Sequence, residues 1–149
     1  MTLRTYQVHV ACHELLGHGT GKLIYRGEDG SCPTFTDPLT GEEFQSCYEK
    51  DDTWNSRFGV ISSAYEECRA DTTGYFLCTF PEVYTLFGFE DHEVDDMFWT
   101  SVMNQLRKGT LGLPLYNLDT KKWGQAHTNG AWVITMWLYK NQVNKIVDF

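Results

Sequence analysis

The sequence predicts a mainly α-helical protein with a small β-hairpin or strand element after the first helix. Apolar residues recur at the helical period in several long stretches, whereas turn residues concentrate in one segment, residues 31–53. A hydrophobic content of 42 % and an aromatic content of 15 % are typical of a globular protein and argue against disorder. At 149 residues, the chain is long enough to bury a core of its own.

The first half of the chain is expected to contain two long helices separated by a loop-rich segment. The first helix should run over residues 5–18 and end at the glycines that follow. Residues 22–25 should form a short strand, and residues 31–53 a long surface excursion with at most a hairpin. The second helix is expected over residues 56–79. The apolar residues that give it a helical period are Phe58, Ile61, Ala64, Tyr65, Cys68, Tyr75 and Leu77.

Helices also dominate the second half. Pro81 should open a short helix that Gly88 closes, because proline suits the first helical turn and glycine the C-terminal cap. A third long helix is expected over residues 91–108 and a fourth over residues 124–141. The apolar side of the third comprises Val94, Met97, Phe98, Val102 and Leu106.

Charge and cysteine content limit the function classes. The formal net charge of −8 speaks against nucleic-acid binding and would suit a cationic partner, such as the ammonium terminus of a peptide. Five cysteines, an odd number without a Cys-x-x-Cys pair, predict free thiols in a reducing compartment. We see no signal peptide and no apolar run of transmembrane length, so a cytoplasmic location without membrane contact is expected.

One short motif indicates metal chemistry, the run His13-Glu14-Leu15-Leu16-Gly17-His18. In the commoner zinc-peptidase motif the two histidines are four residues apart and lie on one helical face. Here they are five apart, which leaves them about 140° apart on a regular helix. Unless the motif is chance, the helix must accommodate one extra residue, most simply as a π-bulge. Gly17 is a position where this distortion costs little conformational energy.

A second motif can supply the third ligand that a catalytic zinc requires. It is the run Glu66-Glu67-Cys68-Arg69-Ala70-Asp71, inside the second expected helix. Glu67 as ligand, with Glu66 and Asp71 accepting hydrogen bonds from the imidazoles, gives every acid a role. Cys68 is an alternative soft ligand, although Glu67 better fits a set of two histidines and one glutamate. Singly, either motif is more often an ordinary solvated helix face.

Together the two motifs resemble the dipeptidyl peptidase III family of zinc exopeptidases from the cytosol. Similar runs occur along nearly the whole chain: Gly19-Thr20-Gly21-Lys22-Leu23, Thr53-Trp54, Phe87-Gly88-Phe89 and Trp123-Gly124-Gln125-Ala126-His127. The resemblance implies that residues 1–149 are the zinc-bearing region of the mostly helical lobe of a longer, two-lobed peptidase. The abrupt ends of the sequence also lead us to expect a piece of a larger protein, whose missing lobe would be a partner.

The resemblance also implies a role for each residue of the site. His13, His18 and Glu67 correspond to the zinc ligands, and Glu14 to the general base that activates water. Glu66 and Asp71 correspond to carboxylates that orient the imidazoles, and His127 to a histidine that stabilises the tetrahedral intermediate. The family has glutamate in place of Asp71, which predicts a shorter and weaker contact. It has arginine where Ala131 stands, which puts one substrate or cleft contact in doubt.

Three hypotheses about function follow. The first is a zinc exopeptidase, with one zinc per chain, that releases dipeptides from the N-termini of oligopeptides. The alternative is a non-catalytic zinc-binding fragment or pseudoenzyme that lacks the substrate-binding lobe. The third is a helical module without metal. The remaining candidate ligands, His9, His92, Cys12 and Cys78, are interpreted as packing or surface residues.

Overall fold

The computed structural model describes residues 2–141, which form two compact units. The first unit combines the N-terminal segment up to Thr20 with the chain from Ser63 onward, and the second unit covers residues 21–62.

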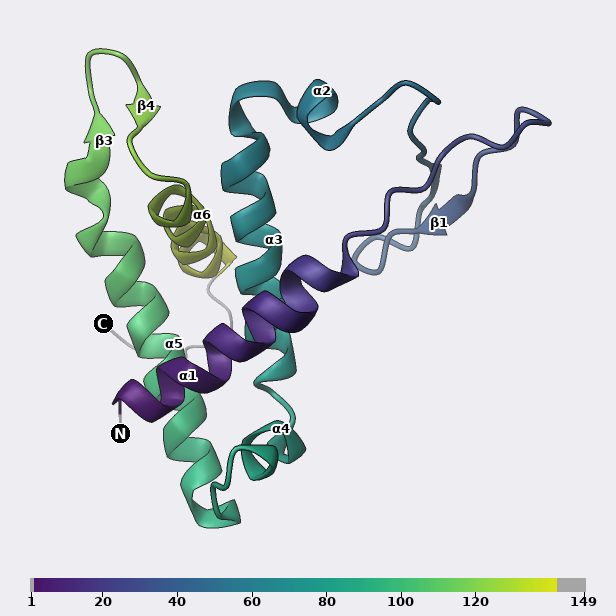
Figure 1. Cartoon of the computed structure of the whole chain (residues 1–149). Helices are drawn as coiled ribbons and strands as arrows, with labels where there is room; N and C mark the ends of the chain where they lie inside the picture. The colour runs from purple at the N-terminus through teal and green to yellow at the C-terminus, as the bar shows by residue number, and fades with distance from the viewer. Residues whose placement is uncertain (1, 142–149) are drawn as a thin grey trace. The chain divides into compact units, whose positions relative to one another are not determined.

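The first unit is almost entirely helical (Figure 1), which confirms the predicted mainly α class. Its helices and single turns are α1 (Thr2–Cys12), η1 (His13–Gly17), η2 (His18–Thr20), α3 (Ser62–Leu77), α4 (Pro81–Leu86), η4 (Asp91–Glu93), α5 (Val94–Leu111), η5 (Leu113–Leu115) and α6 (Ala126–Asn141). The turn η1 is π-helical, and the other η turns are 3₁₀. A two-residue antiparallel pair, β3 (Tyr116–Asn117) with β4 (Lys122–Trp123), joins α5 to α6 and was not predicted.

The helices of the first unit are held together by contacts of α5 with its neighbours and by a small apolar core. Helix α5 lies along α6 and also contacts α1 (Figure 1). A small apolar core comprises Val8, Cys12, Cys78, Tyr84, Phe89, Val94 and Met97. Burying a side chain of this kind stabilises the fold by about 1.5–3 kcal/mol. Cys12 and Cys78 are therefore packing residues, as predicted.

The buried interior also contains polar links between helices. The amide of Gln105 on α5 donates to the backbone oxygen of Ala131 on α6 at 3.1 Å and accepts from the hydroxyl of Tyr75 on α3 at 3.1 Å. One side chain thereby ties together three helices that are far apart in the sequence. Within the described range, no helix has both the length and the apolar character needed to cross a bilayer.

The second unit contains the predicted hairpin, with β1 (Thr34–Thr36) antiparallel to β2 (Glu43–Gln45). It also contains α2 (Trp54–Phe58) and the 3₁₀ turn η3 (Gly59–Ile61). The strand predicted over residues 22–25 is wrong. Of these residues, only Tyr25 forms a β-bridge, to Tyr48. The two backbone hydrogen bonds of this bridge are not continued into a ladder, so no strand forms there.

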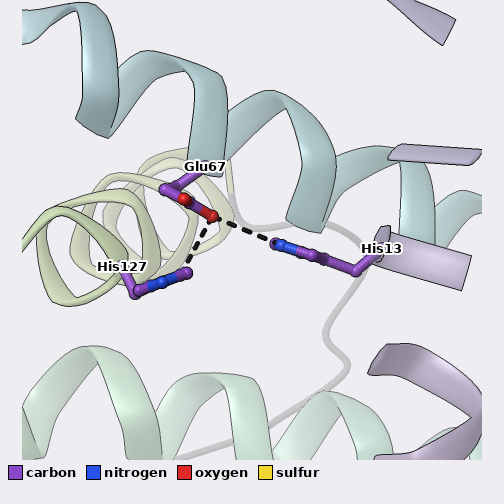
Figure 2. A group of neighbouring side chains, drawn as sticks. All are labelled: His13, Glu67 and His127. Carbon is purple, nitrogen blue, oxygen red and sulfur yellow. Dashed lines mark ion pairs between the residues drawn. The ribbon is translucent and has the colours of Figure 1, made fainter. Parts of the chain in front are cut away.

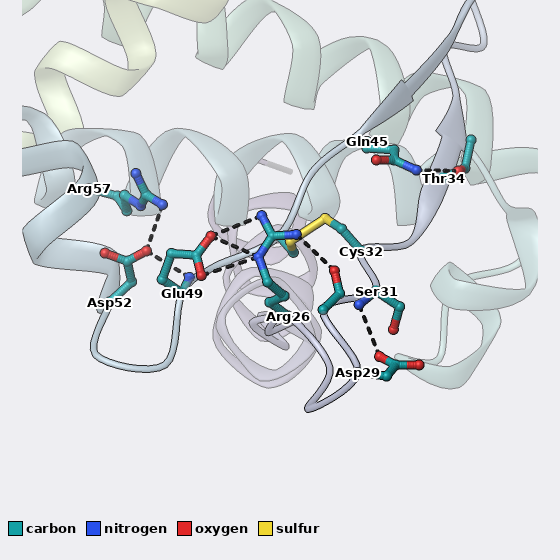
Figure 3. Close-up of a disulfide and its surroundings, with 11 residues drawn as sticks. Arg26, Asp29, Ser31, Cys32, Thr34, Gln45, Glu49, Asp52 and Arg57 are labelled. Atoms are coloured by element: carbon teal, nitrogen blue, oxygen red, sulfur yellow. Dashed lines mark hydrogen bonds and ion pairs between the residues drawn. A yellow bond between two sulfur atoms is a disulfide. The ribbon is translucent and has the colours of Figure 1, made fainter.

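A disulfide in the second unit corrects the expectation of five free thiols (Figure 3). Cys32 and Cys47 are bonded, with their Cα atoms 5.8 Å apart. They lie two residues beyond the paired Thr34 and Gln45 and so continue the register of the hairpin. Sequence spacing did not reveal this pair because its proximity depends on the register of the hairpin. Cys12, Cys68 and Cys78 are free.

The long second helix predicted over residues 56–79 is in fact broken. Gly59 has φ of +50° and ends α2, and α3 starts only at Ser62. A positive φ interrupts the right-handed helix, and glycine adopts it without steric cost. A capping box between Thr53 and Ser56 starts α2 earlier than expected. The remaining helices agree with the predictions within a few residues at each end.

Candidate metal centre

The π-helical turn η1 brings His13 and His18 together. The backbone N–H of His18 donates to the oxygen of His13, five residues earlier, as in a π-helix. The two Nε2 atoms are 3.1 Å apart, and the rings meet edge to face with centroids 4.8 Å apart. The extra residue in the motif is thus absorbed by a bulge, as its spacing predicted.

Gly17 within this bulge is required by packing. A Cβ atom on Gly17 would lie 2.8 Å from the backbone oxygen and 2.9 Å from the Cα of Ala70 on α3. Backbone atoms cannot yield as a flexible side chain can, so a larger residue would push η1 away from α3. Since α3 carries the acidic motif, Gly17 sets the approach between the two motifs.

Glu67 projects from α3 toward both histidines. Its Oε2 lies 3.3 Å from Nε2 of His13 and 3.7 Å from Nε2 of His18. This oxygen is buried and has no hydrogen-bond partner among the described residues. A tetrahedral zinc with bonds of about 2.0–2.1 Å would hold its ligand atoms about 3.3 Å apart. The three atoms therefore have the spacing of three corners of a zinc site.

The outer nitrogens of both imidazoles are held by carboxylates. Nδ1 of His13 donates to Oδ1 of Asp71 at 2.8 Å, and Nδ1 of His18 donates to Oε1 of Glu66 at 2.9 Å. With the proton on Nδ1, each Nε2 presents a lone pair to the other and to Glu67. Acceptor atoms this close repel each other unless a cation lies between them, so the set fits a metal ion.

Asp71 reaches its histidine despite its short side chain. Its contact with His13, at 2.8 Å, is as short as that of Glu66 with His18, at 2.9 Å. The Asp71 side chain is only 2 % exposed, and Nζ of Lys108, on α5, lies 3.3 Å from its other oxygen. Lys108 was missed from the sequence because 37 residues separate the pair and no local pattern links them.

Arg69 supports the second carboxylate. Its guanidinium contacts both oxygens of Glu66, at 2.6 and 3.0 Å. The hydrogen bond from Arg69 lowers the pKa of the Glu66 carboxyl, and the bond to His18 adds to this effect. Residues three apart on a helix are neighbours, so this pair could have been found from the sequence.

Cys68, the alternative ligand, belongs to none of the side-chain groups that could hold a metal within the described residues. Burial raises the pKa of its thiol, which disfavours the thiolate that a metal needs.

Glu14 lies close to the histidine pair. It is exposed, and a carboxylate oxygen of Glu14 lies with a nitrogen of each of His13 and His18 in a group whose atoms are all within 4.8 Å. Among the carboxylates around the two histidines, Glu66, Glu67 and Asp71 are more shielded than Glu14. Glu14 can therefore exchange protons with water beside a bound metal.

His127 reaches the site from the first turn of α6 (Figure 2). Its Nδ1 lies 3.0 Å from Oε2 of Glu67, and its ring centroid is 6.1 Å from that of His13. His127, His13 and Glu67 form a second group that could hold a metal. The sequence-predicted residues of the site therefore lie together, although they come from η1, η2, α3 and α6.

Ala131 lies one turn further along α6, in the packed interior of the first unit. It is completely buried, and its backbone oxygen accepts the hydrogen bond from Gln105. The position at which the resemblance implied a cleft arginine is thus used for helix packing in this chain.

His9 and His92 lie in different surroundings. His9 is buried, and its ring stacks on Tyr75 with centroids 4.0 Å apart. Burial lowers the pKa of His9, although the nearby Asp71 carboxylate partly opposes this. His92 is exposed beside Glu90. The interpretation of both as packing or surface residues agrees with these positions.

Comparisons with known proteins agree with the two motifs. The model of peptidase family M49 matches residues 1–149. The chain is 42 % identical over 134 residues to dipeptidyl peptidase 3 of Rattus norvegicus and of Homo sapiens, which covers 87 % of this chain and 18 % of each relative. It is 29 % identical over 146 residues to dipeptidyl peptidase 3 of Dictyostelium discoideum, covering 90 % of this chain and 21 % of the relative. The chain thus spans about a fifth of the length of these relatives.

Proposed function

This chain belongs to peptidase family M49, and on that premise we propose that it is the zinc-binding part of a metallopeptidase. The single observation that carries the proposal is the cluster of acceptor atoms on His13, His18 and Glu67, spaced 3.1–3.7 Å apart. The Glu67 oxygen of this cluster is buried and has no hydrogen-bond partner among the described residues. Two imidazoles and one carboxylate are a common ligand set of catalytic zinc. One zinc per chain follows from this set.

The proposed reaction is the release of dipeptides from the N-termini of oligopeptides. When bound, zinc acts as a Lewis acid that lowers the pKa of its water and polarises a peptide carbonyl. Glu14 takes the proton from the attacking water and returns it to the leaving amine. The oligopeptide substrate and the dipeptide product are suggested by the names of the relatives.

The remaining residues of the site act through orientation and charge. Asp71 and Glu66 keep the proton on Nδ1 of His13 and His18, so that both Nε2 atoms stay available to the metal. His127 can donate to the oxyanion that develops on the scissile carbonyl. Its exposed fraction of 44 % leaves it accessible to a substrate.

Substitutions separate metal binding from chemistry. Changing His13, His18 or Glu67 to alanine should abolish zinc binding, measured by elemental analysis of the purified chain. In the full-length protein, Glu14→Ala should keep the zinc but lose hydrolysis of a dipeptidyl-arylamide. Full activity of that variant would contradict the assigned mechanism.

A second candidate function is a zinc-binding fragment or pseudoenzyme without turnover. The observation that favours it is coverage, since the chain spans only 18 % of its relatives. Large apolar side chains also stay exposed in the first unit: Leu3, Leu15, Leu86, Leu111, Leu118 and Tyr139. They support the proposal that residues 1–149 belong to a lobe of a larger, two-lobed protein. Turnover by these 149 residues at the full-length rate would exclude the non-catalytic alternative.

A cytoplasmic location is part of the same proposal. The free thiols of Cys12, Cys68 and Cys78 support it, whereas the disulfide between Cys32 and Cys47 is more typical of an oxidising compartment. Alkylation of the protein inside intact cells, followed by mass spectrometry, would show whether Cys32 and Cys47 are reduced there. Reduced Cys32 and Cys47 in the cell would support the cytoplasm.

A further inference from the structure

The carboxylate of Asp71 is held at both of its oxygens. Oδ1 accepts the hydrogen bond from Nδ1 of His13 at 2.8 Å, and Oδ2 accepts from Nζ of Lys108 at 3.3 Å. The side chain of Asp71 is only 2 % exposed, so the carboxylate is almost entirely removed from water. Lys108 comes from α5, a helix that contributes no residue to the candidate metal groups found in the described range.

We propose that Lys108 is a positioning residue for metal binding: by holding Oδ2 of Asp71, it fixes the carboxylate that orients His13. The inference rests on the proposed zinc binding and deepens it, because it names a residue that acts on the metal through two others. Lys108 itself belongs to neither candidate metal group.

An ordinary surface ion pair does not describe this contact. Exposed pairs contribute little because water screens both charges. Here the cation is 37 % exposed, but the anion is buried. The nearby His9 lies 3.8 Å from Oδ1, the other oxygen, which leaves Lys108 as the partner of Oδ2 among the described residues. Without Lys108, a buried and charged oxygen would lack a partner, and the carboxylate would turn away from His13 or admit water.

The packing of α5 on α3 places Lys108 beside Asp71. A second contact joins the same two helices, since the hydroxyl of Tyr75 donates to Oε1 of Gln105 at 3.1 Å. Tyr75 follows Asp71 by one turn of α3, and Gln105 precedes Lys108 by one turn of α5. Residues three or four apart share a helix face, so the two contacts lie on adjacent levels of one interface. Together they fix how α5 is aligned along α3.

The other imidazole has the same arrangement within a single helix. His18 donates to Glu66, whose oxygens accept from Arg69 at 2.6 and 3.0 Å. Glu66 and Arg69 both belong to α3, so this pair forms wherever α3 forms. The pair of Asp71 and Lys108 forms only when α5 packs on α3. Metal binding should therefore depend on a helix that carries none of the proposed ligands.

Lys108→Met distinguishes positioning from charge repulsion. Removing a positive charge near a dication should by itself tighten zinc binding, because like charges repel. We expect the opposite, a zinc Kd about tenfold higher, at the low end of the about 10- to 100-fold that partners of metal-bound histidines contribute. Competition with a chromogenic chelator measures the Kd. A Lys108→Met chain that binds zinc as tightly as the parent, or more tightly, would overturn the inference.

Arg107→Met is the matched control. It removes the same charge from the neighbouring, exposed position of α5 and should not raise the zinc Kd. An equal rise in both variants would show that the charge of α5, and not the contact with Asp71, determines the affinity. Lys108→Arg keeps the charge and should restore most of the affinity lost in Lys108→Met. An arginine variant as weak as the methionine variant would also contradict the inference.

A double-mutant cycle tests whether Lys108 acts through Asp71. In a chain that already carries Asp71→Asn, Lys108→Met should raise the zinc Kd no further, because the carboxylate that Lys108 holds is gone. If Lys108→Met raised the Kd by the same factor with and without Asp71→Asn, Lys108 would act by another route, and its positioning role would be refuted.

Circular dichroism of the zinc-free chains checks that the variants fold. If Lys108→Met does not fold, Lys108→Gln takes its place with the same expected rise, since it removes the charge but keeps a polar side chain at a partly exposed position. A parent chain that binds no zinc at all overturns the proposed function itself. Zinc binding by the parent that substitutions of Lys108 leave unchanged overturns only the role of Lys108.

Discussion

Nδ1 of His13 donates a hydrogen bond of 2.8 Å to Oδ1 of Asp71 across 58 residues of sequence. The Asp71 carboxylate is almost fully buried, and Lys108 contacts its second oxygen at 3.3 Å. A histidine that ligates a metal is oriented by the acceptor on its other nitrogen. Asp71 is thus the group that fixes the direction in which His13 presents Nε2.

Replacing Asp71 by asparagine should weaken zinc binding without removing a ligand. The amide has nearly the same size, but it lacks the charge that holds the proton on Nδ1 of His13. We expect the zinc Kd to rise by about 10- to 100-fold, measured by competition with a chromogenic chelator. Asp95→Asn, at an exposed position of α5, is the control and should leave the Kd unchanged. Equal affinities of the two variants would refute the role of Asp71.

Gly17→Ala should destabilise the chain and weaken metal binding together. The new methyl group would meet the backbone of Ala70 at 2.8–2.9 Å, which forces η1 away from α3. Overpacking of this kind costs about 1–3 kcal/mol. Urea unfolding with a chelator present measures the free energy of unfolding, and zinc titration measures the affinity. Gly19→Ala is matched, because a Cβ there would have no other atom within 4 Å, and it should change neither quantity.

Removing the disulfide should affect the second unit alone. Changing Cys32 and Cys47 to serine frees a loop with a sequence separation of 15 residues, and closing such a loop stabilises a fold by about 3 kcal/mol. We expect faster amide exchange over residues 21–62 and an unchanged zinc Kd, because His13, His18, Glu67 and His127 all lie in the first unit. A large loss of zinc affinity would contradict this separation.

The buried His9 should make the metal-free chain sensitive to acid. Burial lowers its folded pKa below the unfolded value of 6.5, despite the opposing Asp71 carboxylate, while Lys108 and His13 lower it further. The unfolded chain therefore takes up the proton first. The stability that neutral His9 contributes is complete above about pH 6.5 and is lost as the pH falls below it.

Unfolding in urea with a chelator present, at pH 7 and pH 5.5, measures this effect. The free energy of unfolding should fall less between the two values for His9→Gln than for the parent. His92→Gln, at an exposed position, should behave like the parent. A parent and a His9→Gln variant with identical pH dependence would show that His9 does not titrate as described.

Local regularities in the sequence were sufficient for the fold class and part of the site. The helical period predicted helix α5 within a few residues, because apolar spacing reports directly on a buried helix face. The five-residue gap between His13 and His18 predicted a π-bulge as the simplest way to bring them together, and η1 is that bulge. Such features depend on neighbours within one or two turns, which sequence patterns record.

Only the tertiary structure decided which distant side chains meet. The break at Gly59 depends on a positive φ, and the pairing of Cys32 with Cys47 depends on the register of the hairpin. The contacts of Lys108 with Asp71 and of His127 with Glu67 depend on how α5 and α6 pack against α3. A motif records the chemistry of one segment, but the number of ligands around a metal depends on all the segments that reach it. Which side chains meet at the proposed metal site is therefore decided by how the helices pack, to which Gly17 contributes through its close approach to Ala70.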